Sequence, residues 1–173
     1  MTNKLMPNTT APALSLPLVG GGTWTLADQM PEMFSMVIFY RGLHCPVCRN
    51  YLNKLKGLMD GYTKAGFSVV IASMNDQATA EQTVAEWDIA DLPMAYGLTE
   101  EDARAWGLYI SKGINEVEVQ TFCEPGTFWV RPDGRLYLID IASMPFARPD
   151  LEILLSKVGA MGNGYPARGT REG

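Results

Sequence analysis

Residues 37–52 read VIFYRGLHCPVCRNYL, and the rest of the predicted fold is arranged around them. Met36–Tyr40 is a short apolar run rich in β-branched and aromatic residues, which predicts a buried strand that ends at Arg41 and Gly42. From Pro46 onward apolar residues recur at helical spacing, and proline suits the first turn of a helix because that position has no amide partner to lose. The stretch therefore predicts a strand, a short loop, and a helix that opens with two cysteines.

The two cysteines predict redox chemistry. Cys45 is expected at the helix N-terminus, where free amides and the helix dipole favour a thiolate over a thiol. Cys48 follows one turn later, placed to attack a mixed disulfide on Cys45 and release the product. Arg41 and Arg49 flank the pair and are expected to add positive potential. His44, the only histidine, is interpreted either as a group that stabilises the thiolate or shuttles a proton, or as a solvated loop residue.

Two other interpretations of the pair remain open. A Cys-x-x-Cys pair also occurs in zinc sites, and His44 and Cys123 would complete four ligands. However, His44 adjoins Cys45 and the chain has no second paired motif, which disfavours a metal. The pair could also be two buried structural cysteines. Redox use is the favoured interpretation, so we expect no metal and no cofactor beyond a redox-active disulfide.

Composition limits the functional class. The 173-residue chain is long enough for one domain with a substantial core, and its net charge of −5 argues against nucleic acid or an anionic membrane as the main partner. Prolines interrupt the N-terminal region, so no signal peptide is predicted, and no apolar run reaches the length of a membrane span. A cytoplasmic location is expected, where thiols are kept reduced and a cysteine pair is more often catalytic than structural.

The other elements follow from local patterns. The strand 67–73 after the first helix would complete a βαβ unit with parallel strands. Further expected elements are an N-terminal hairpin (14–19 and 23–26), a helix (78–87), a short strand (92–96), a short helix after Thr99, a hairpin (127–130 and 136–141) and a closing helix (150–161). Residues 109–122 predict no element and are expected to include a loop over the site. The expected organisation is a flexible N-terminus (1–11), one domain (12–161) and a C-terminal tail (162–173).

This order of elements resembles the thioredoxin fold over about residues 12–168, and within it the peroxiredoxin-like branch of the alkyl hydroperoxide reductase/thiol-specific antioxidant (AhpC/TSA) group. The resemblance implies an α/β fold with a central mixed sheet flanked by helices and an N-terminal β-hairpin extension. The segments that carry it are Phe39–Gly42 with Cys45–Cys48, Pro125–Val130 with Asp133-Gly134, Ser143–Pro149 and Tyr165–Gly169.

The resemblance also implies roles for individual residues. Cys45 would be the nucleophilic or peroxidatic cysteine and Cys48 the resolving one. Pro125 would match the cis-proline that faces the cysteines, although the residue alone also fits an ordinary trans turn. Pro46 and Thr127 are expected to be supporting residues of the same site. The implied partners are a thiol or disulfide protein or small-thiol reductant, and a hydroperoxide as a further substrate; the resemblance allows a homodimer, which the residue pattern does not itself indicate.

The chain departs from the peroxidase members of that branch. Those members carry a Pro-x-x-x-Thr-x-x-Cys pattern and an arginine just before the hairpin strand, which together hold the peroxide. Here the matching positions are Ile38, Gly42 and Glu124-Pro125. Thiol-disulfide exchange is therefore the expected activity. A thiol-dependent peroxidase in which Arg41 replaces the missing charge is the alternative, and a non-enzymatic redox-sensing or zinc-binding module is a third hypothesis.

Two minor features are interpreted by residue type. Cys123 lies close to Pro125 in the chain and would be a second disulfide partner, a modification site or a small buried hydrophobe, the last being favoured. The methionines Met74, Met94 and Met144 are interpreted as core residues rather than as the lining of an apolar pocket.

Overall fold

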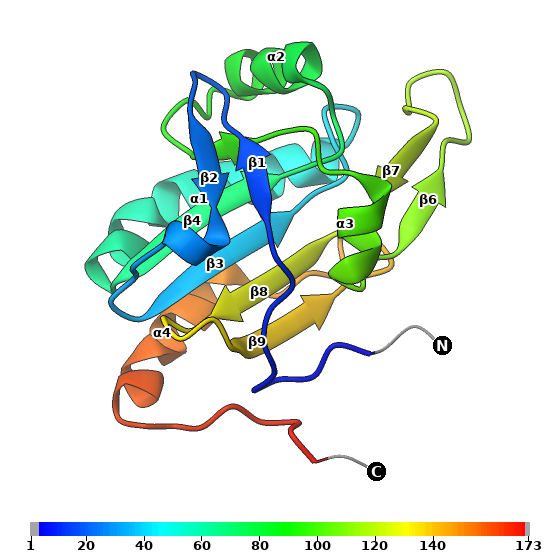
Figure 1. Cartoon of the computed structure of the whole chain (residues 1–173). Helices are drawn as coiled ribbons and strands as arrows, with labels where there is room; N and C mark the ends of the chain where they lie inside the picture. The colour runs from blue at the N-terminus through cyan, green and yellow to red at the C-terminus, as the bar shows by residue number, and fades with distance from the viewer. Residues whose placement is uncertain (1–3, 172–173) are drawn as a thin grey trace.

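The computed structural model describes residues 4–171, and its centre is a mixed five-stranded sheet (Figure 1). The order across the sheet is β5-β4-β3-β8-β9, with β5, β4 and β3 parallel and β8 antiparallel to both of its neighbours. Pairing of β3 with β4 confirms the predicted βαβ unit. The strand bounds are β3 (Phe34–Phe39), β4 (Phe67–Ala72), β5 (Met94–Ala95), β8 (Gly126–Val130) and β9 (Leu136–Ile141).

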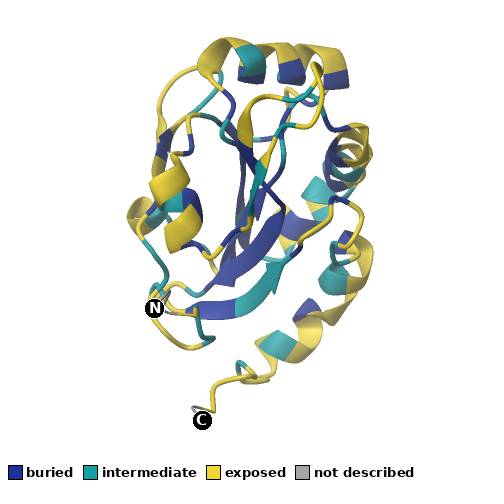
Figure 2. Cartoon of the chain, turned by 90° about the vertical axis from the view of Figure 1, so that its right-hand side faces the viewer, coloured by how far each residue is buried: buried dark blue, intermediate teal, exposed yellow. Residues whose placement is uncertain are grey.

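Both faces of the sheet are covered, because successive residues of β3 point to opposite sides. Met36 and Ile38 belong to a core that α1, α2 and α4 complete, whereas Val37 and Phe39 face a second core that includes α3 and the N-terminal hairpin. Figure 2 shows the buried strands between these two layers. The helices are α1 (Pro46–Lys64), α2 (Gln77–Trp87), α3 (Glu100–Ala105) and α4 (Leu151–Gly162).

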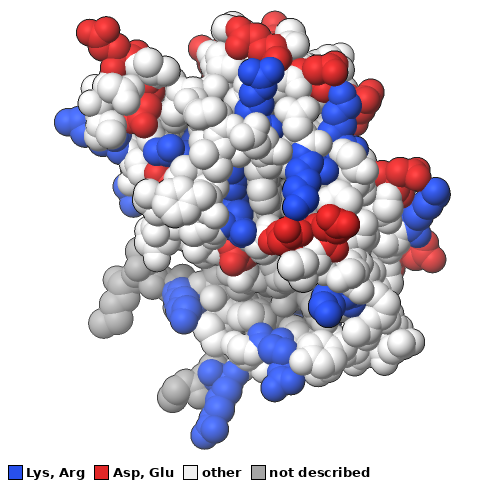
Figure 3. All heavy atoms as spheres, turned by 180° about the vertical axis from the view of Figure 1, so that it is seen from behind, with Lys and Arg blue, Asp and Glu red and all other residues white. Residues whose placement is uncertain are grey.

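Helix α1 forms where the sequence predicts it. Cys45 is the N-cap and Pro46 the first helical residue, and the buried face of the helix carries Leu52, Leu55 and Tyr62. On the outer side, acidic and basic side chains are interspersed (Figure 3). One of the ion pairs, Lys54 with Asp150 at 3.0 Å, links α1 to the N-cap of α4. Within residues 4–171 no helix is long and apolar enough to cross a membrane.

The predicted N-terminal hairpin is present as β1 (Ser15–Pro17) and β2 (Thr23–Thr25), followed by a short 3₁₀ turn, η1 (Leu26–Asp28). Before it, the backbone nitrogen of Asn8 donates to the carbonyl of Leu136 at 2.7 Å. The flexibility of residues 1–11 stays a prediction, and residues 1–3 lie outside the described part.

The C-terminal tail contacts the domain through one clear bond. The hydroxyl of Tyr137 donates to the backbone carbonyl of Tyr165 at 2.8 Å. The predicted boundary between the domain and the C-terminal tail, at residue 162, stays a prediction. Residues 172–173 lie outside the described part.

A second hairpin lies where the sequence predicts no element. Strands β6 (Ile110–Lys112) and β7 (Thr121–Cys123) pair antiparallel and stand beside the main sheet (Figure 1). Each strand is only three residues long. All three residues of β6 are exposed or half-buried, so no alternation of apolar and polar residues marks this strand in the sequence. The hairpin is tied to the domain where the amide of Glu124 donates to the carbonyl of Tyr109 at 2.8 Å.

Candidate active site

The two cysteines lie where the chain leaves the carboxyl end of β3 and enters α1. Gly42 adopts φ +133°, a region that side chains rarely occupy, and a Cβ there would lie 2.7 Å from Oδ1 of Asn75. The same oxygen accepts a hydrogen bond from the amide of Leu43 at 3.0 Å. Asn75 follows β4, so the ends of two adjacent strands fix the loop that delivers Cys45 to the helix start.

Cys45 is arranged as a thiolate. The amide of Cys48 donates to its Sγ at 3.2 Å, which also caps α1. A hydrogen bond from the Cys48 side chain is the largest cause that lowers the pKa of Cys45 to about 6; burial opposes it, and the Cys48 amide and the charges of Arg41 and Arg148 lower the pKa further. The thiolate therefore predominates at neutral pH.

Cys48 has the opposite character. Its side chain is fully buried, and burial, followed by the hydrogen bond to Cys45, raises the pKa of its thiol far above the ordinary value. Both residues are free thiols in the structure. The geometry therefore brings the predicted pair together and makes it unequal, with an ionised Cys45 beside a protonated Cys48.

Arg41 is held by carboxylates from the region of the second hairpin. Its Nε lies 3.2 Å from Oε2 of Glu124, its Nη2 lies 3.8 Å from Oε1 of Glu118, and its guanidinium stacks 4.7 Å from the centre of the Phe122 ring. Ser111 donates to the other oxygen of Glu124 at 2.7 Å. The β6–β7 hairpin is thus fastened to the loop that carries Cys45, and two anions share the charge of Arg41.

His44 lies against the same hairpin rather than in solvent. It is half-buried, its ring centre is 4.6 Å from that of Phe122, and neither ring nitrogen has a hydrogen-bond partner among the described residues. Burial, followed by the charge of Arg41, lowers the pKa of His44. The imidazole is therefore neutral at pH 7 and supplies no positive charge to the thiolate.

Pro125 does not match the implied cis-proline. Residues 4–171 contain no cis peptide bond, so the bond between Glu124 and Pro125 is trans. The backbone on either side is hydrogen-bonded: the Glu124 amide donates to the carbonyl of Tyr109, and the Pro125 carbonyl accepts from the amide of Ala142 at 2.9 Å. The trans form is the one that X–Pro bonds favour intrinsically, by about 0.5–1 kcal/mol.

The supporting residues lie in different surroundings. Thr127 is fully buried on β8 and its hydroxyl has no hydrogen-bond partner among the described residues, although it is close enough to Tyr51 of α1 to affect that residue's pKa. Pro46 is exposed at the first helical position. Arg49 is exposed and turns toward α2, where it donates to the carbonyl of Glu86 at 3.2 Å.

Arg148 belongs to the site, although the sequence pattern predicts no role for it. Its guanidinium carbon lies 4.0 Å from the ring centre of Tyr51, and its Nε donates to the carbonyl of Pro145 at 2.8 Å. Its charge lowers the pKa of both Cys45 and Cys48. The one feature of the sequence that pointed to this residue is that Ser143–Pro149 is among the segments that resemble the family.

Contacts between helices fix the position of Arg148. The hydroxyl of Tyr51 donates to the carbonyl of Pro149 at 2.8 Å, and that of Tyr62 donates to the carbonyl of Leu151 at 2.6 Å. Both tyrosines lie on α1, so the start of α4 is held against the helix that carries the cysteines.

Cys123 is a buried residue apart from the pair. Its Sγ contacts the carbonyl of Tyr40 at 3.5 Å, and burial raises the pKa of its thiol to about 12. The favoured interpretation as a small buried hydrophobe agrees with this position. Among the methionines, Met94 is buried and accepts a bond from the hydroxyl of Tyr40 at 3.0 Å, as predicted for a core residue. Met74 is half-buried against the second core, whereas Met144 is 46% exposed, so the core prediction is wrong for Met144.

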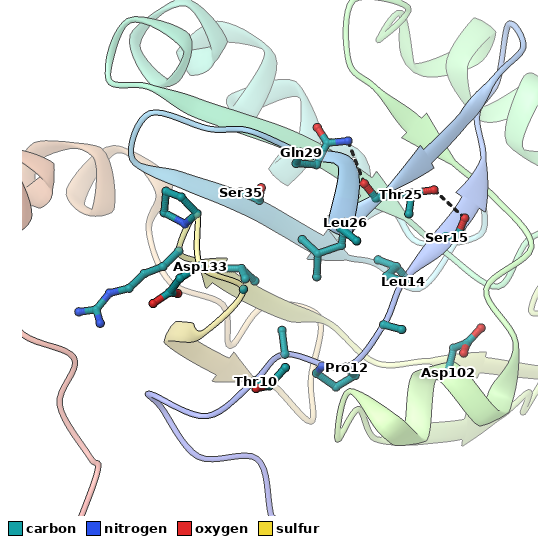
Figure 4. Close-up of a pocket in the computed structure, with 17 residues that line it drawn as sticks. Thr10, Pro12, Leu14, Ser15, Thr25, Leu26, Gln29, Ser35, Asp102 and Asp133 are labelled. Carbon is teal, nitrogen blue, oxygen red and sulfur yellow. Dashed lines mark hydrogen bonds between the residues drawn. The ribbon is translucent and has the colours of Figure 1, made fainter.

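No metal-binding cluster is formed within the part of the chain that the structure describes: no three His, Cys, Asp or Glu side chains are placed to hold an ion. A cavity of about 680 Å³ lies at the other end of the sheet, near Ser35, Thr25 and Asp133 (Figure 4). Ser35 pairs with Val130, whereas the active-site end of β3 pairs with Gly126. The cavity is therefore separate from the cysteines.

Comparison with known proteins identifies the family of the chain. The model of the AhpC/TSA family matches residues 7–139. A Mycobacterium tuberculosis protein named "Putative peroxiredoxin Rv2521" is 29% identical over 135 residues, which cover 78% of this chain and 84% of that protein.

Two solved structures show the fold. Peroxidoxin BcpB of Mycobacterium tuberculosis superposes with a TM-score of 0.73 at 15% identity, covering 91% of this chain and 99% of that one. A Chlorobium tepidum structure described as a "putative Thiol:disulfide interchange protein DsbE" gives 0.67 at 22% identity, covering 90% and 100%. These similarities confirm the thioredoxin-like fold with its central mixed sheet. Because one match is called a peroxidoxin and the other an interchange protein, the fold alone does not select the reaction.

Proposed function

The chain belongs to the AhpC/TSA family as a peroxiredoxin-like protein of thioredoxin fold, and from that premise we propose that it is a thiol-disulfide oxidoreductase. In this proposal Cys45 and Cys48 cycle between dithiol and disulfide. The observation that carries it is the hydrogen bond from the Cys48 amide to Sγ of Cys45. This bond helps to lower the pKa of Cys45, and it places the second thiol, that of Cys48, one helical turn away.

The proposed cycle has two exchange steps. The Cys45 thiolate attacks one sulfur of a substrate disulfide, that S–S bond breaks, and the leaving thiolate departs while a mixed disulfide remains on Cys45. Cys48 then loses its proton, attacks Sγ of Cys45 and releases the second substrate thiol. Two electrons pass from the protein dithiol to the substrate. A thiol or dithiol reductant returns them.

The unequal pair suits this order of events. The neighbouring Cys45 is one of the causes that keep the pKa of Cys48 high. When Cys45 becomes part of a mixed disulfide its negative charge disappears, so that contribution is lost and ionisation of Cys48 becomes easier. Cys48 therefore stays protonated until it is needed for resolution.

A thiol-dependent peroxidase is the second candidate, favoured by the family and by the cationic Arg148 near Cys45. Here the Cys45 thiolate would attack the terminal oxygen of a hydroperoxide, break the O–O bond and form a sulfenic acid with release of an alcohol or water. Cys48 would then condense with it and release water. Against this reading, Gly42 has no hydroxyl where peroxidase members carry threonine, and Arg41 is shared with Glu118 and Glu124.

Rapid-mixing fluorescence with two oxidants separates the candidates. The reduced protein is mixed with hydrogen peroxide or with a small disulfide, its tryptophan signal is followed, and free thiols are counted afterwards. For the oxidoreductase we expect faster reaction with the disulfide and a fall from three free thiols to one. Cys123→Ser is the matched control, which should react normally and fall to none. Faster oxidation by peroxide than by the disulfide would select the peroxidase instead.

A further inference from the structure

Arg148 carries a pair of donors that the protein does not use. Its Nη1 and Nη2 are buried, and neither has a hydrogen-bond partner among the described residues. Its Nε is bound to the carbonyl of Pro145 and the guanidinium stacks on Tyr51, so the group is held in one place. Buried donors of a charged group are costly to leave unsatisfied. The pair is therefore a fixed cationic fork that needs an acceptor.

The shape of the group selects the acceptor. The two terminal nitrogens of a guanidinium lie in one plane and match the two oxygens of a carboxylate. Arg41, the other arginine whose charge acts on Cys45, lies 3.2 Å from Glu124 and 3.8 Å from Glu118 and so already has carboxylate partners. Arg148 has no ion pair among the described residues.

We propose that Arg148 is the carboxylate-binding residue for a small disulfide substrate of Cys45, so that the preferred substrates carry a carboxylate close to the disulfide bond. This inference rests on the proposed oxidoreductase function and adds the substrate class to it. Thr127, whose buried hydroxyl is also unpartnered, lies close enough to Tyr51 to affect the pKa of that residue.

Entry of such a substrate requires a local opening of the surface around Cys45 and the terminal nitrogens of Arg148, with Arg148 still stacked on Tyr51. Cys45 is only 1% exposed and the guanidinium nitrogens are covered. Ser143–Pro149 contains no helix or strand, and it exposes Met144 and Phe146 at 46% and 70%.

The chemistry of the step is unchanged by the anchor. The Cys45 thiolate attacks the nearer sulfur of the bound disulfide, the S–S bond breaks, and the departing carboxylate-bearing thiolate takes a proton from water. The protein is oxidised and the disulfide reduced by the same two electrons. Without a cation, the thiolate and a substrate carboxylate would repel each other, so an anionic disulfide should react more slowly than its neutral amide. A preference for the anion is thus a direct sign of the anchor.

The test compares three small disulfides of matched length. Dithiodiglycolate is anionic, its diamide is neutral and cystamine is cationic. For the wild type we expect the order anion, neutral, cation in second-order rate constant. In Arg148→Gln the ratio of anionic to neutral rate should fall about tenfold or more, as loss of a charge-assisted pair predicts. Because both reagents meet the same thiolate, a change in the pKa of Cys45 cancels in this ratio.

Two variants complete the design. Arg49→Gln removes an exposed arginine of α1, the helix that carries the cysteines, and should leave the ratio unchanged. Arg148→Lys keeps a charge but not the two-nitrogen fork, so the ratio should fall partway; it also decides the matter if Arg148→Gln does not fold. An unchanged ratio in the Arg148 variants, or no anion preference in the wild type, overturns the inference while disulfide exchange stands. No reaction with any of the disulfides would overturn the proposed function as well.

Discussion

The amide nitrogen of Cys48 lies 3.2 Å from Sγ of Cys45 and donates a hydrogen bond to it. The same bond caps α1, because the side chain of an N-cap residue takes one of the donors that a helix start leaves free. The start of the helix and the reactivity of Cys45 are therefore coupled. Any change that frays the first turn of α1 would break the hydrogen bond that the Cys45 thiolate accepts and so raise the pKa of Cys45.

The pH profile of Cys45 follows directly. Its pKa is lowered from 9.0 to about 6, so the thiolate forms as the pH rises through 6 and is about nine-tenths formed at pH 7. The rate of alkylation by iodoacetamide should rise with a midpoint near pH 6 and be flat around neutrality. Cys48 and Cys123 do not contribute there because the pKa of each thiol is raised. A midpoint near 9, or the same profile in Cys45→Ser, would contradict the assignment.

Single substitutions separate the roles of the three cysteines. Cys45→Ser should abolish reaction with disulfides, because no thiolate remains at the helix start. Cys48→Ser should still react once and then hold the substrate as a mixed disulfide on Cys45, seen as a fixed mass increase that a small thiol reverses. Cys123→Ser should cycle normally, since its sulfur faces the carbonyl of Tyr40. Full activity in Cys45→Ser would refute the site.

Local signals were enough to predict the helix that carries the cysteines. A proline at the first turn, a glycine that ends the strand and an apolar stripe beginning at Val47 are all features of neighbouring residues. The final hairpin was predicted for the same reason, and β9 has the predicted bounds Leu136–Ile141.

The parts that could not be predicted depend on contacts between distant segments. Arg148 reaches the cysteines only because Tyr51 binds the carbonyl of Pro149 and so docks the start of α4 on α1. The β6–β7 hairpin is defined by partners rather than by a pattern, since Arg41 joins it to the site through Glu124. The implied cis-proline was wrong because it came from the resemblance alone, whereas the bond before Pro125 is trans in the structure.

Glu124→Gln tests the tie between the second hairpin and the active-site loop. The side chain of Glu124 is only 5% exposed. Replacing its carboxylate with a neutral amide leaves Arg41 without its nearest negative charge. We expect a loss of about 1–3 kcal/mol in the free energy of unfolding, measured with urea. Since Arg41 lowers the pKa of Cys45, an uncompensated Arg41 should lower that pKa further, and iodoacetamide profiles would show it.

Glu118→Gln is the control for this ion pair. Glu118 lies farther from Arg41, at 3.8 Å, so its substitution should cost less than about 1 kcal/mol and shift the pKa of Cys45 less. Equal effects of the two substitutions would show that Glu124 has no special part in holding the hairpin.

Gly42→Ala tests whether the loop before Cys45 must have its observed backbone. The new Cβ would meet the Asn75 side chain at 2.7 Å, and φ +133° is unfavourable for alanine. Relief of either strain displaces Asn75, which breaks its bond to the Leu43 amide and loosens the N-cap at Cys45. We expect a loss of about 1–3 kcal/mol in the free energy of unfolding and a rise in the pKa of Cys45.

Gly57→Ala on α1 is the matched control: a Cβ there meets nothing within 4 Å, and the substitution should stabilise the helix by about 0.5–1 kcal/mol. If Gly42→Ala left both the stability and the alkylation profile as they are in the wild type, the loop would not be what positions Cys45.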